Sequence, residues 1–371
     1  MRIDLSGSRL HDLQTFRQSA WLECMHPRTL AGSQLAHLVR DGISGVDANL
    51  VGLAGAYAED GAYREVVAEL RAAGATAQQI YERMSMEDLR RAADRLRRVY
   101  NNTSGHDGYV SFDVSPALAD DADGTESEAR RLWSMIDRPN AMIKVPATDA
   151  GLVAIRRLVA AGLNVNATAI FGVRRYRQVA DAYLLGLEDR AAQSLPLERV
   201  ASVASVFVSH IDTAVDKELD AIQQVDKAAR AKRLRGRAAV AVAQFAYQRY
   251  KIVIASPRWQ LLAACHAQPQ RLLWASADIH DAHCSDLKYV NELIGRDTIT
   301  AMSMSTLDAY RDHGVAAPKL EHDLLEVLAL FGDLDALRID LDRVSTQLER
   351  DSLGETAAGL NARLTRLASA A

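Results

Sequence analysis

The sequence predicts an α/β fold, a closed (β/α)8 TIM barrel, on three observations. Eight short runs typical of β-strands alternate with longer helical stretches along the chain. Eight is the number of parallel strands that closes a barrel of this kind. The length of 371 residues suits such a barrel, and no internal repeat, low-complexity tract or Pro/Gly/Ser-rich linker divides the chain. We therefore expect a single domain over residues 1–371.

The expected strands are short and largely apolar, as strands covered by helices on both faces should be. Helices that cross back over the sheet are expected between them. The strands are Ser19–Glu23, Ile43–Asn49, Tyr109–Val114, Ala141–Val145, Asn164–Thr168, Ala201–Phe207, Arg271–Ser276 and Thr298–Met302.

Three stretches are too long for simple crossovers and are expected to be helical. Residues 52–108 contain the clearest amphipathic patterns, AYREVVAELRAAGA and MEDLRRAADRLRRVY. Residues 212–257 form a second helical insertion. The C-terminal segment, 317–371, is also expected to be helical, and it could pack over one mouth of the barrel.

Composition and charge exclude several classes of protein. The net charge of −4 gives no global positive field for nucleic acid. Six cations lie within Lys227–Arg237, but no aromatic residue is interleaved with them, so we interpret this run as a solvated helix face. No window approaches the roughly 18 apolar residues that cross a bilayer. We expect no nucleic-acid and no membrane partner.

The cysteine spacing and the motif content of the sequence bear on disulfides, metals and cofactors. The three cysteines, Cys24, Cys265 and Cys284, are far apart and form no CxxC pair. We therefore expect no disulfide framework and no structural zinc site, and we expect a cytoplasmic location. No GxGxxG follows a strand and no P-loop occurs. The histidines of HDAH (280–283) are a weak metal motif. We expect neither a cofactor nor a metal.

Polar side chains recur near the carboxyl ends of the expected strands. Residues two apart share a face of a strand, and in a barrel the carboxyl ends converge on the active site. The recurrence therefore favours a site over a set of unrelated strand caps. The residues concerned are Glu23, Asp47, Asn49, Ser111, Asp113, Lys144, Asn166, Thr168 and Ser205.

Lys144 is the most informative of these residues, because it lies in the apolar run AMIKVPAT. Burial of the cation is costly, and desolvation lowers the pKa of a lysine towards a neutral amine that can form a Schiff base with a carbonyl. The alternative is a buried ion pair of Lys144 with Asp47 or Asp113. Such charge networks also perturb pKa values without being sites.

Schiff-base chemistry also needs acid/base groups and groups that hold the substrate. Glu23 and Asp113 are the candidates for proton transfer, with a water held by Thr168. Asn49 and Asn166 are the candidates for binding substrate hydroxyls.

At these residues the chain resembles the transaldolase family, in the long form found in actinobacteria. The most specific segment is RPNAMIKVPATDAGLVAIRRLVAAGLNVNATAIFGVRRYRQVADAYLLGLE (138–188). Residues 202–217, 272–295 and 298–314 also resemble family motifs. The resemblance implies a class I aldolase-like barrel and a metal-free mechanism. A ketose phosphate forms a Schiff base, retro-aldol cleavage releases an aldose phosphate, and the three-carbon ketol unit passes to another aldose phosphate in the pentose phosphate pathway.

The resemblance also implies roles for individual residues. Lys144 falls on the Schiff-base lysine, and Asn49 and Asn166 fall on the two family asparagines. Thr168 falls on the threonine that holds the catalytic water, and Ser205 on the serine of the sixth strand.

Several positions depart from the family pattern. Glu23 stands where the family has its first-strand aspartate, and Asp113 where it has its third-strand glutamate. Each carboxylate therefore shifts by about one methylene. A misplacement on the order of 1 Å can lower the reaction rate roughly 10²-fold. Asp47 adds a carboxylate near Lys144 that favours the ammonium form. His210 and His280 stand for two cations that hold the substrate phosphate, and histidine is mostly neutral at pH 7.

Three functions remain open from the sequence. The first is an ordinary transaldolase in which protonated His210 and His280 still bind phosphate. The second is a divergent Schiff-base aldolase or transaldolase for a non-standard sugar, differently phosphorylated or unphosphorylated. The third is a non-catalytic barrel that binds a ligand. In each case the partner is a small sugar or sugar phosphate, and the chain is a monomer or homodimer.

Overall fold

Eight parallel strands close into a barrel in chain order, β1 to β8. The computed structural model describes residues 8–24, 26–279, 284–321 and 324–369. The predicted (β/α)8 barrel is confirmed, and every strand boundary lies within two residues of its expected position. The strands are β1 Ser19–Cys24, β2 Ile43–Ala48, β3 Val110–Asp113, β4 Ala141–Pro146, β5 Val165–Ile170, β6 Ser202–Phe207, β7 Arg271–Ala275 and β8 Ile299–Met302.

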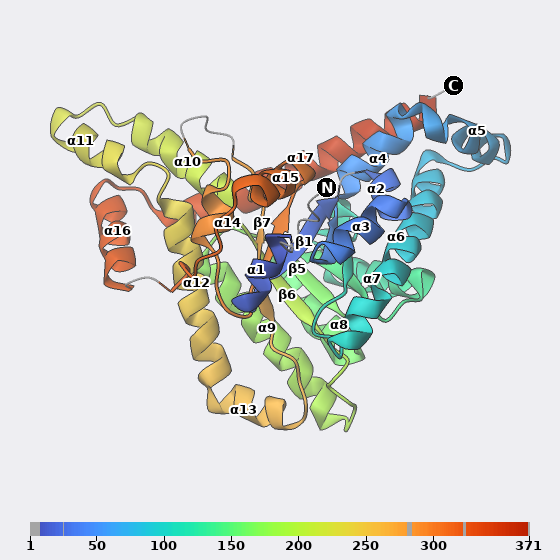
Figure 1. Ribbon diagram of the computed structural model, residues 1–371, viewed down its shortest axis with the longest axis horizontal. Helices are drawn as coiled ribbons and strands as arrows, with labels where there is room; N and C mark the ends of the chain where they lie inside the picture. Colours follow the sequence, from blue (N-terminus) through green and yellow to red (C-terminus); the bar gives the residue numbers. More distant parts are fainter. Residues whose placement is uncertain (1–7, 25, 280–283, 322–323, 370–371) are drawn as a thin grey trace, which may run out of the picture.

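Helices surround the barrel and include the extra ones expected from the sequence (Figure 1). Among the described residues, no helix is long and apolar enough to span a membrane. The helices are α1 Leu10–Thr15, α2 Pro27–Ala31, α3 Ser33–Arg40, α4 Leu50–Glu59, α5 Arg64–Ala72, α6 Ala77–Asn102, α7 Ala122–Ile136, α8 Asp149–Ala161, α9 Val173–Ala192, α10 Val208–Asp220, α11 Val225–Leu234, α12 Ala238–Ala255, α13 Pro257–Ala264, α14 Lys288–Glu292, α15 Met304–His313, α16 Leu324–Ala336 and α17 Leu341–Ser369. Two short 3₁₀ turns, η1 Gly61–Tyr63 and η2 Pro116–Leu118, complete the set.

The C-terminal helix α17 lies across the carboxyl ends of the strands. It packs against α4, α6 and α10 and touches β5 and η2, and Figure 1 shows it running alongside α4. Ser345 donates a hydrogen bond to the carbonyl oxygen of Phe171, directly after β5. The sequence left the position of the C-terminal segment open, and the structure places α17 at this end of the barrel and α16 against α12.

The barrel interior is apolar towards the amino ends of its strands. Trp21, Met142, Val203 and Leu273 are buried there in one cluster. Gly45 on β2 leaves room for the Trp21 indole, because a Cβ atom at this position would lie 2.3 Å from a ring carbon. This packed layer closes the barrel beneath the polar groups at the other end.

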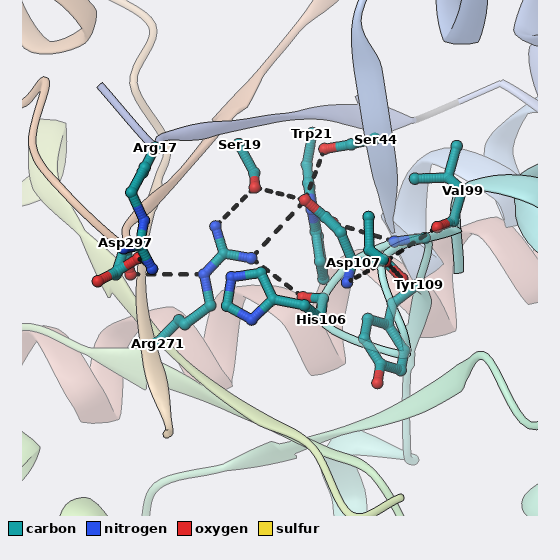
Figure 2. Close-up of polar contacts among 12 residues, drawn as sticks. Arg17, Ser19, Trp21, Ser44, Val99, His106, Asp107, Tyr109, Arg271 and Asp297 are labelled. Carbon is teal, nitrogen blue, oxygen red and sulfur yellow. Dashed lines mark hydrogen bonds and ion pairs between the residues drawn. The ribbon is translucent and has the colours of Figure 1, made fainter. Parts of the chain in front are cut away.

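A buried charge network seals the amino ends of the strands (Figure 2). Arg271 and Asp107 are both almost fully buried, with Nη1 of the arginine 3.7 Å from Oδ2 of the aspartate. Trp21 Nε1 and the Ser44 hydroxyl donate to Asp107 at 2.8 and 2.9 Å, and the Ser19 hydroxyl also donates to it. The network satisfies charges that would otherwise be costly to bury.

Candidate active site

Lys144 lies near the carboxyl end of β4 and is almost fully buried. Its Nζ is 3.2 Å from Asp47 Oδ1 and 3.5 Å from Asp113 Oδ1, and it donates to the carbonyl oxygen of Ala48 at 3.4 Å. The parallel register places Lys144 beside Asp113 on β3 and beside Asn166 on β5. The structure therefore brings the lysine and its predicted neighbours together.

Of the two alternatives that the sequence left open for Lys144, the structure shows the ion pair with Asp47 and Asp113. Burial of Lys144 lowers its pKa, but the negative charges of Asp113 and Asp47 oppose that effect and raise the pKa above the ordinary value for lysine. The two ion pairs account for this result, because opposite charges within about 4–6 Å stabilise the charged form. The raised pKa of Lys144 favours its ammonium form beside Asp47 and Asp113.

Asp47 is fixed in place by neighbours from three other strands. Its Oδ1 accepts hydrogen bonds from Ser111 Oγ at 2.5 Å and from Asn166 Nδ2 at 3.4 Å, and it also faces Lys144. Asn166 donates to Ser111 Oγ at 3.0 Å and accepts from Ser205 Oγ at 2.7 Å. Four buried polar side chains thus form one connected network around the lysine.

Glu23 on β1 is partly buried and interacts with the same group of charges. Its pKa is raised from 4.5 to about 7 by burial and by Asp47, and Asp278 raises it further while Lys144 lowers it. The pKa of Asp113 is also raised by burial, against the lowering effect of Lys144. A carboxyl group with a pKa near 7 can both accept and donate a proton at neutral pH.

Thr168 and Asn49 lie at the same end of the barrel. Thr168 is buried on β5, directly before Ala169, which has a φ of 59° where the pairing with β6 shifts register. Asn49 follows β2 as the N-cap of α4, and its Oδ1 accepts from the backbone N–H of Gly52 at 2.9 Å.

The structure describes one of the two histidines predicted at the phosphate end. His210 lies in the first turn of α10, half-buried, with its ring 5.9 Å from that of Phe171 and 5.8 Å from that of Phe207. His280 lies outside the described residues.

Asp278 is a site residue that the sequence predictions did not include. It follows β7, and its Oδ1 accepts hydrogen bonds from the hydroxyls of Ser303, at 2.7 Å, and Thr306. The signal that could have found it is the one shared by the other candidates, a polar residue just after a strand at the carboxyl end of the barrel. The family pattern instead placed the substrate contact of this segment at the neighbouring His280.

A groove of about 880 Å³ lies between α17 and the loops after β3, β4 and β5. Two arginines at the start of α9, Arg174 and Arg175, line it. Arg175 is paired with Glu349 at 3.0 Å and with Asp149 at 2.7 Å. The groove has three arginines and four carboxylates among its lining residues, so it has no excess of positive charge.

The fold and the site together define a (β/α)8-barrel protein with a lysine at the carboxyl ends of its strands. The family model described as transaldolase/fructose-6-phosphate aldolase matches residues 29–365. The chain belongs to this family, as its motifs predicted.

Several curated relatives are similar over most of their length. A transaldolase of Thiobacillus denitrificans is 42% identical over 339 residues, covering 91% of this chain and 93% of the relative. A transaldolase of Saccharopolyspora erythraea is 42% identical over 350 residues, covering 94% and 93%. Transaldolase 1 of Streptomyces coelicolor is 40% identical over 339 residues, covering 91% and 88%.

Proposed function

We propose that this chain is a transaldolase-type enzyme in which Lys144 forms a Schiff base with a ketose and transfers a three-carbon ketol unit to an aldose. The main observation is the burial of Lys144 between Asp47 and Asp113 at the carboxyl ends of the strands. Membership of the family and the names of the relatives support the same reaction class.

The two ion pairs of Lys144 fit Schiff-base chemistry in spite of the ammonium state. Asp113, 3.5 Å from Nζ, is placed to take one proton and release a neutral amine to attack the ketone carbon. Loss of water from the carbinolamine then gives an iminium ion, which is again a cation at the same place. Carboxylates that stabilise the ammonium ion also stabilise this iminium ion.

Glu23 suits the proton transfers of carbon–carbon cleavage. Its ionised carboxylate takes the proton of the C4 hydroxyl while the C3–C4 bond breaks, which leaves an enamine on Lys144 and releases an aldose. The protonated carboxyl returns the proton when the enamine adds to the next aldehyde. A pKa of about 7 lets Glu23 act in both directions near neutral pH.

The remaining polar groups fit substrate binding and positioning. In this proposal Asn49 Nδ2 donates to a substrate hydroxyl, and Thr168 holds the water exchanged during imine formation. Asn166 Nδ2 donates to the adjacent oxygens of Ser111 and Asp47, so we assign Asn166 to holding Asp47 in the unliganded protein. We further propose a sugar other than the common sugar phosphates as substrate, because Glu23, Asp113 and His210 depart from the family motifs.

Borohydride trapping tests the Schiff base directly. The protein is incubated with dihydroxyacetone or fructose, reduced with borohydride, and measured by intact mass and peptide mapping. We expect one adduct, located on Lys144. Lys144→Arg keeps the positive charge but forms no imine, so it is the matched control and should give no adduct. Absence of any adduct in the unmodified protein would favour a ligand-binding barrel without catalysis.

Transfer from fructose 6-phosphate to erythrose 4-phosphate separates the two enzymatic alternatives. A kcat/KM of roughly 10⁴ M⁻¹s⁻¹ or more would indicate an ordinary transaldolase. Undetectable transfer with intact trapping would indicate a specialised Schiff-base enzyme, which is the result we expect.

A further inference from the structure

The C-terminal helix α17 rests directly on the turn between β5 and α9. The Ser345 hydroxyl lies 2.9 Å from the carbonyl oxygen of Phe171 and 2.7 Å from that of Leu341, and it shares its single hydrogen between them. Gly172 allows this close approach, because a Cβ atom there would lie 2.4 Å from Ser345 Oγ. The helix therefore contacts the backbone that follows β5 without an intervening side chain.

An ion pair between Arg175 and Glu349 anchors the same turn. Nε and Nη2 of Arg175 each donate to one carboxylate oxygen of Glu349 at 3.0 Å, and the two side chains are only 16% and 13% exposed. Such a two-point contact fixes geometry as well as adding energy. Nη1 of the arginine also donates to Asp149, the first residue of α8, at 2.7 Å. Arg175 thus joins α17 to the helices that follow β4 and β5.

The backbone held in this way includes a strained residue next to Thr168. Ala169 has a φ of 59°, where the pairing of β5 with β6 shifts register. A non-glycine residue in the left-handed region is disfavoured, and it persists only where the surrounding structure fixes it. Thr168 is buried directly before Ala169, and the anchored carbonyl of Phe171 follows after it. The contacts of α17 are therefore placed to stabilise the conformation that sets the position of Thr168.

We propose that the Arg175–Glu349 pair positions Thr168 for imine formation. By anchoring the turn after β5, this pair and Ser345 hold the threonine hydroxyl where it keeps the water exchanged at the lysine. The inference rests on the proposed function, because the water-holding role of Thr168 belongs to it. The anchoring residues are positioning residues that act through Thr168 and need no contact with the substrate.

The step that depends on this anchoring is the loss of water from the carbinolamine. Asp113 takes one proton from the lysine ammonium group and returns it to the carbinolamine hydroxyl, which leaves as water while the C–O bond breaks and the C=N bond forms. Proton transfer through a water requires hydrogen-bond distances, so a displaced Thr168 slows it. Ketose binding through Asn49 and the ion pairs of Lys144 do not depend on the turn after β5.

Glu349→Gln tests the anchor, because glutamine keeps the size of the side chain but loses its charge and one of its two acceptor oxygens. Rapid-quench borohydride trapping of the full-length protein with dihydroxyacetone measures three quantities. These are the maximal rate of imine formation, the half-saturating concentration, and the pH midpoint. We expect the maximal rate to fall about tenfold, since a displacement on the order of 1 Å can cost roughly 10²-fold. The other two quantities should not change.

Two further variants separate the anchor from the general stability of α17. Glu218→Gln breaks the more exposed pair that joins α10 to Arg343 of α17 at 2.6 Å, so it is the matched control and should leave the rate unchanged. Ser345→Ala removes the other contact with the turn and should also lower the rate. It keeps the proposal testable if Glu349→Gln fails to fold. A structural role alone would lower the urea midpoint and leave the rate of the folded protein unchanged.

A double-mutant cycle with Thr168→Val shows whether the anchor acts through the threonine. Valine has nearly the same shape and no hydroxyl, so this variant should also lower the maximal rate. In the Thr168→Val background, Glu349→Gln should then have little further effect, because residues that act as one unit are not additive. Additive effects would show that α17 does not act through Thr168.

An unchanged rate in folded Glu349→Gln or Ser345→Ala, an equal fall in Glu218→Gln, or additivity in the cycle would overturn the proposal. The outcome is distinct from that of the proposed function. Absence of an adduct in the unmodified protein would refute the proposed function and the positioning role with it. Normal trapping in the unmodified protein with an unaffected Glu349→Gln variant would refute only the positioning role.

Discussion

Asn166 Nδ2 on β5 donates a hydrogen bond to Asp47 Oδ1 on β2 across 3.4 Å of the barrel interior. The same oxygen accepts from Ser111 and faces Lys144 at 3.2 Å. Asp47 is therefore held beside the lysine by side chains on other strands and cannot turn away without breaking several contacts. The protonation state of Lys144 depends on this arrangement.

Asp47→Asn should make Lys144 easier to deprotonate. The substitution removes a negative charge 3.2 Å from Nζ and keeps an oxygen that accepts from Ser111 and Asn166. Because this charge raises the pKa of Lys144, its removal should lower the midpoint of the pH profile for borohydride trapping by on the order of one pH unit.

Asp113→Asn is the matched comparison for this measurement. It also removes a neighbouring charge and should also lower the midpoint, but it removes the proposed proton acceptor, so the maximal trapping rate should fall. A midpoint that stays the same in Asp47→Asn would show that the ion pair does not control the amine.

Glu23→Gln should separate imine formation from carbon–carbon cleavage. Glutamine cannot accept the proton of the substrate hydroxyl, so ketol transfer should fall by roughly 10²–10⁴-fold. Trapping at Lys144 should remain, because the lysine forms the imine without Glu23. If the carboxylate is the base for cleavage, kcat/KM of the unmodified enzyme should rise with pH through about 7, the pKa of Glu23. Equal loss of trapping and transfer would contradict the separate roles.

The ionised carboxylate of Glu23 should lower the free energy of unfolding, with the full effect above about pH 7. Below pH 4.5 the carboxyl is protonated in both folded and unfolded states, and the cost is absent. Between pH 4.5 and about 7 the folded state holds the proton more tightly, so stability falls as pH rises, and the cost is complete above that range.

Urea unfolding of Glu23→Gln measures this cost. The variant should gain stability relative to the unmodified protein between pH 5 and pH 8, by on the order of 2 kcal/mol after allowance for partial exposure. Glu65→Gln, on an exposed face of α5, should show no such pH-dependent gain. A parallel pH dependence in Glu23→Gln and the unmodified protein would contradict the raised pKa.

His210→Arg should increase the affinity for phosphate-bearing sugars. A fixed positive charge would replace a ring that lies against Phe171 and Phe207 at the barrel mouth. Arginine can bind phosphate through two parallel hydrogen bonds, so the fructose 6-phosphate concentration that half-saturates borohydride trapping at Lys144 should fall by about tenfold. Fructose, which has no phosphate, is the control substrate and should show no change. Equal effects on both sugars would show that His210 does not face the phosphate end.

The strands were predictable from the sequence because a parallel barrel requires short apolar runs between helices. Polar residues at the ends of those runs also predicted which side chains meet around Lys144, because the carboxyl ends of barrel strands converge. The charge state of Lys144 was not predictable in this way, because it depends on distances to Asp47 and Asp113 on two other strands. The contacts of Asn166 were not predictable for the same reason, since only the fold shows that its Nδ2 group donates to Asp47 and Ser111.

Asp107→Ala should destabilise the barrel without changing the chemistry at its other end. The substitution leaves Arg271 buried without its carboxylate and removes the acceptor for Trp21 and Ser44. Loss of one partner of a buried ion pair costs about 3–5 kcal/mol, measurable as a lower urea midpoint. Asp107→Asn keeps an acceptor oxygen and should lose less, while Asp123→Ala at an exposed site should lose little. Borohydride trapping at Lys144 should remain in all three variants under native conditions, because the packed apolar layer separates the two ends of the barrel. Loss of trapping in a folded Asp107→Asn variant would show that the charge network and the site are coupled.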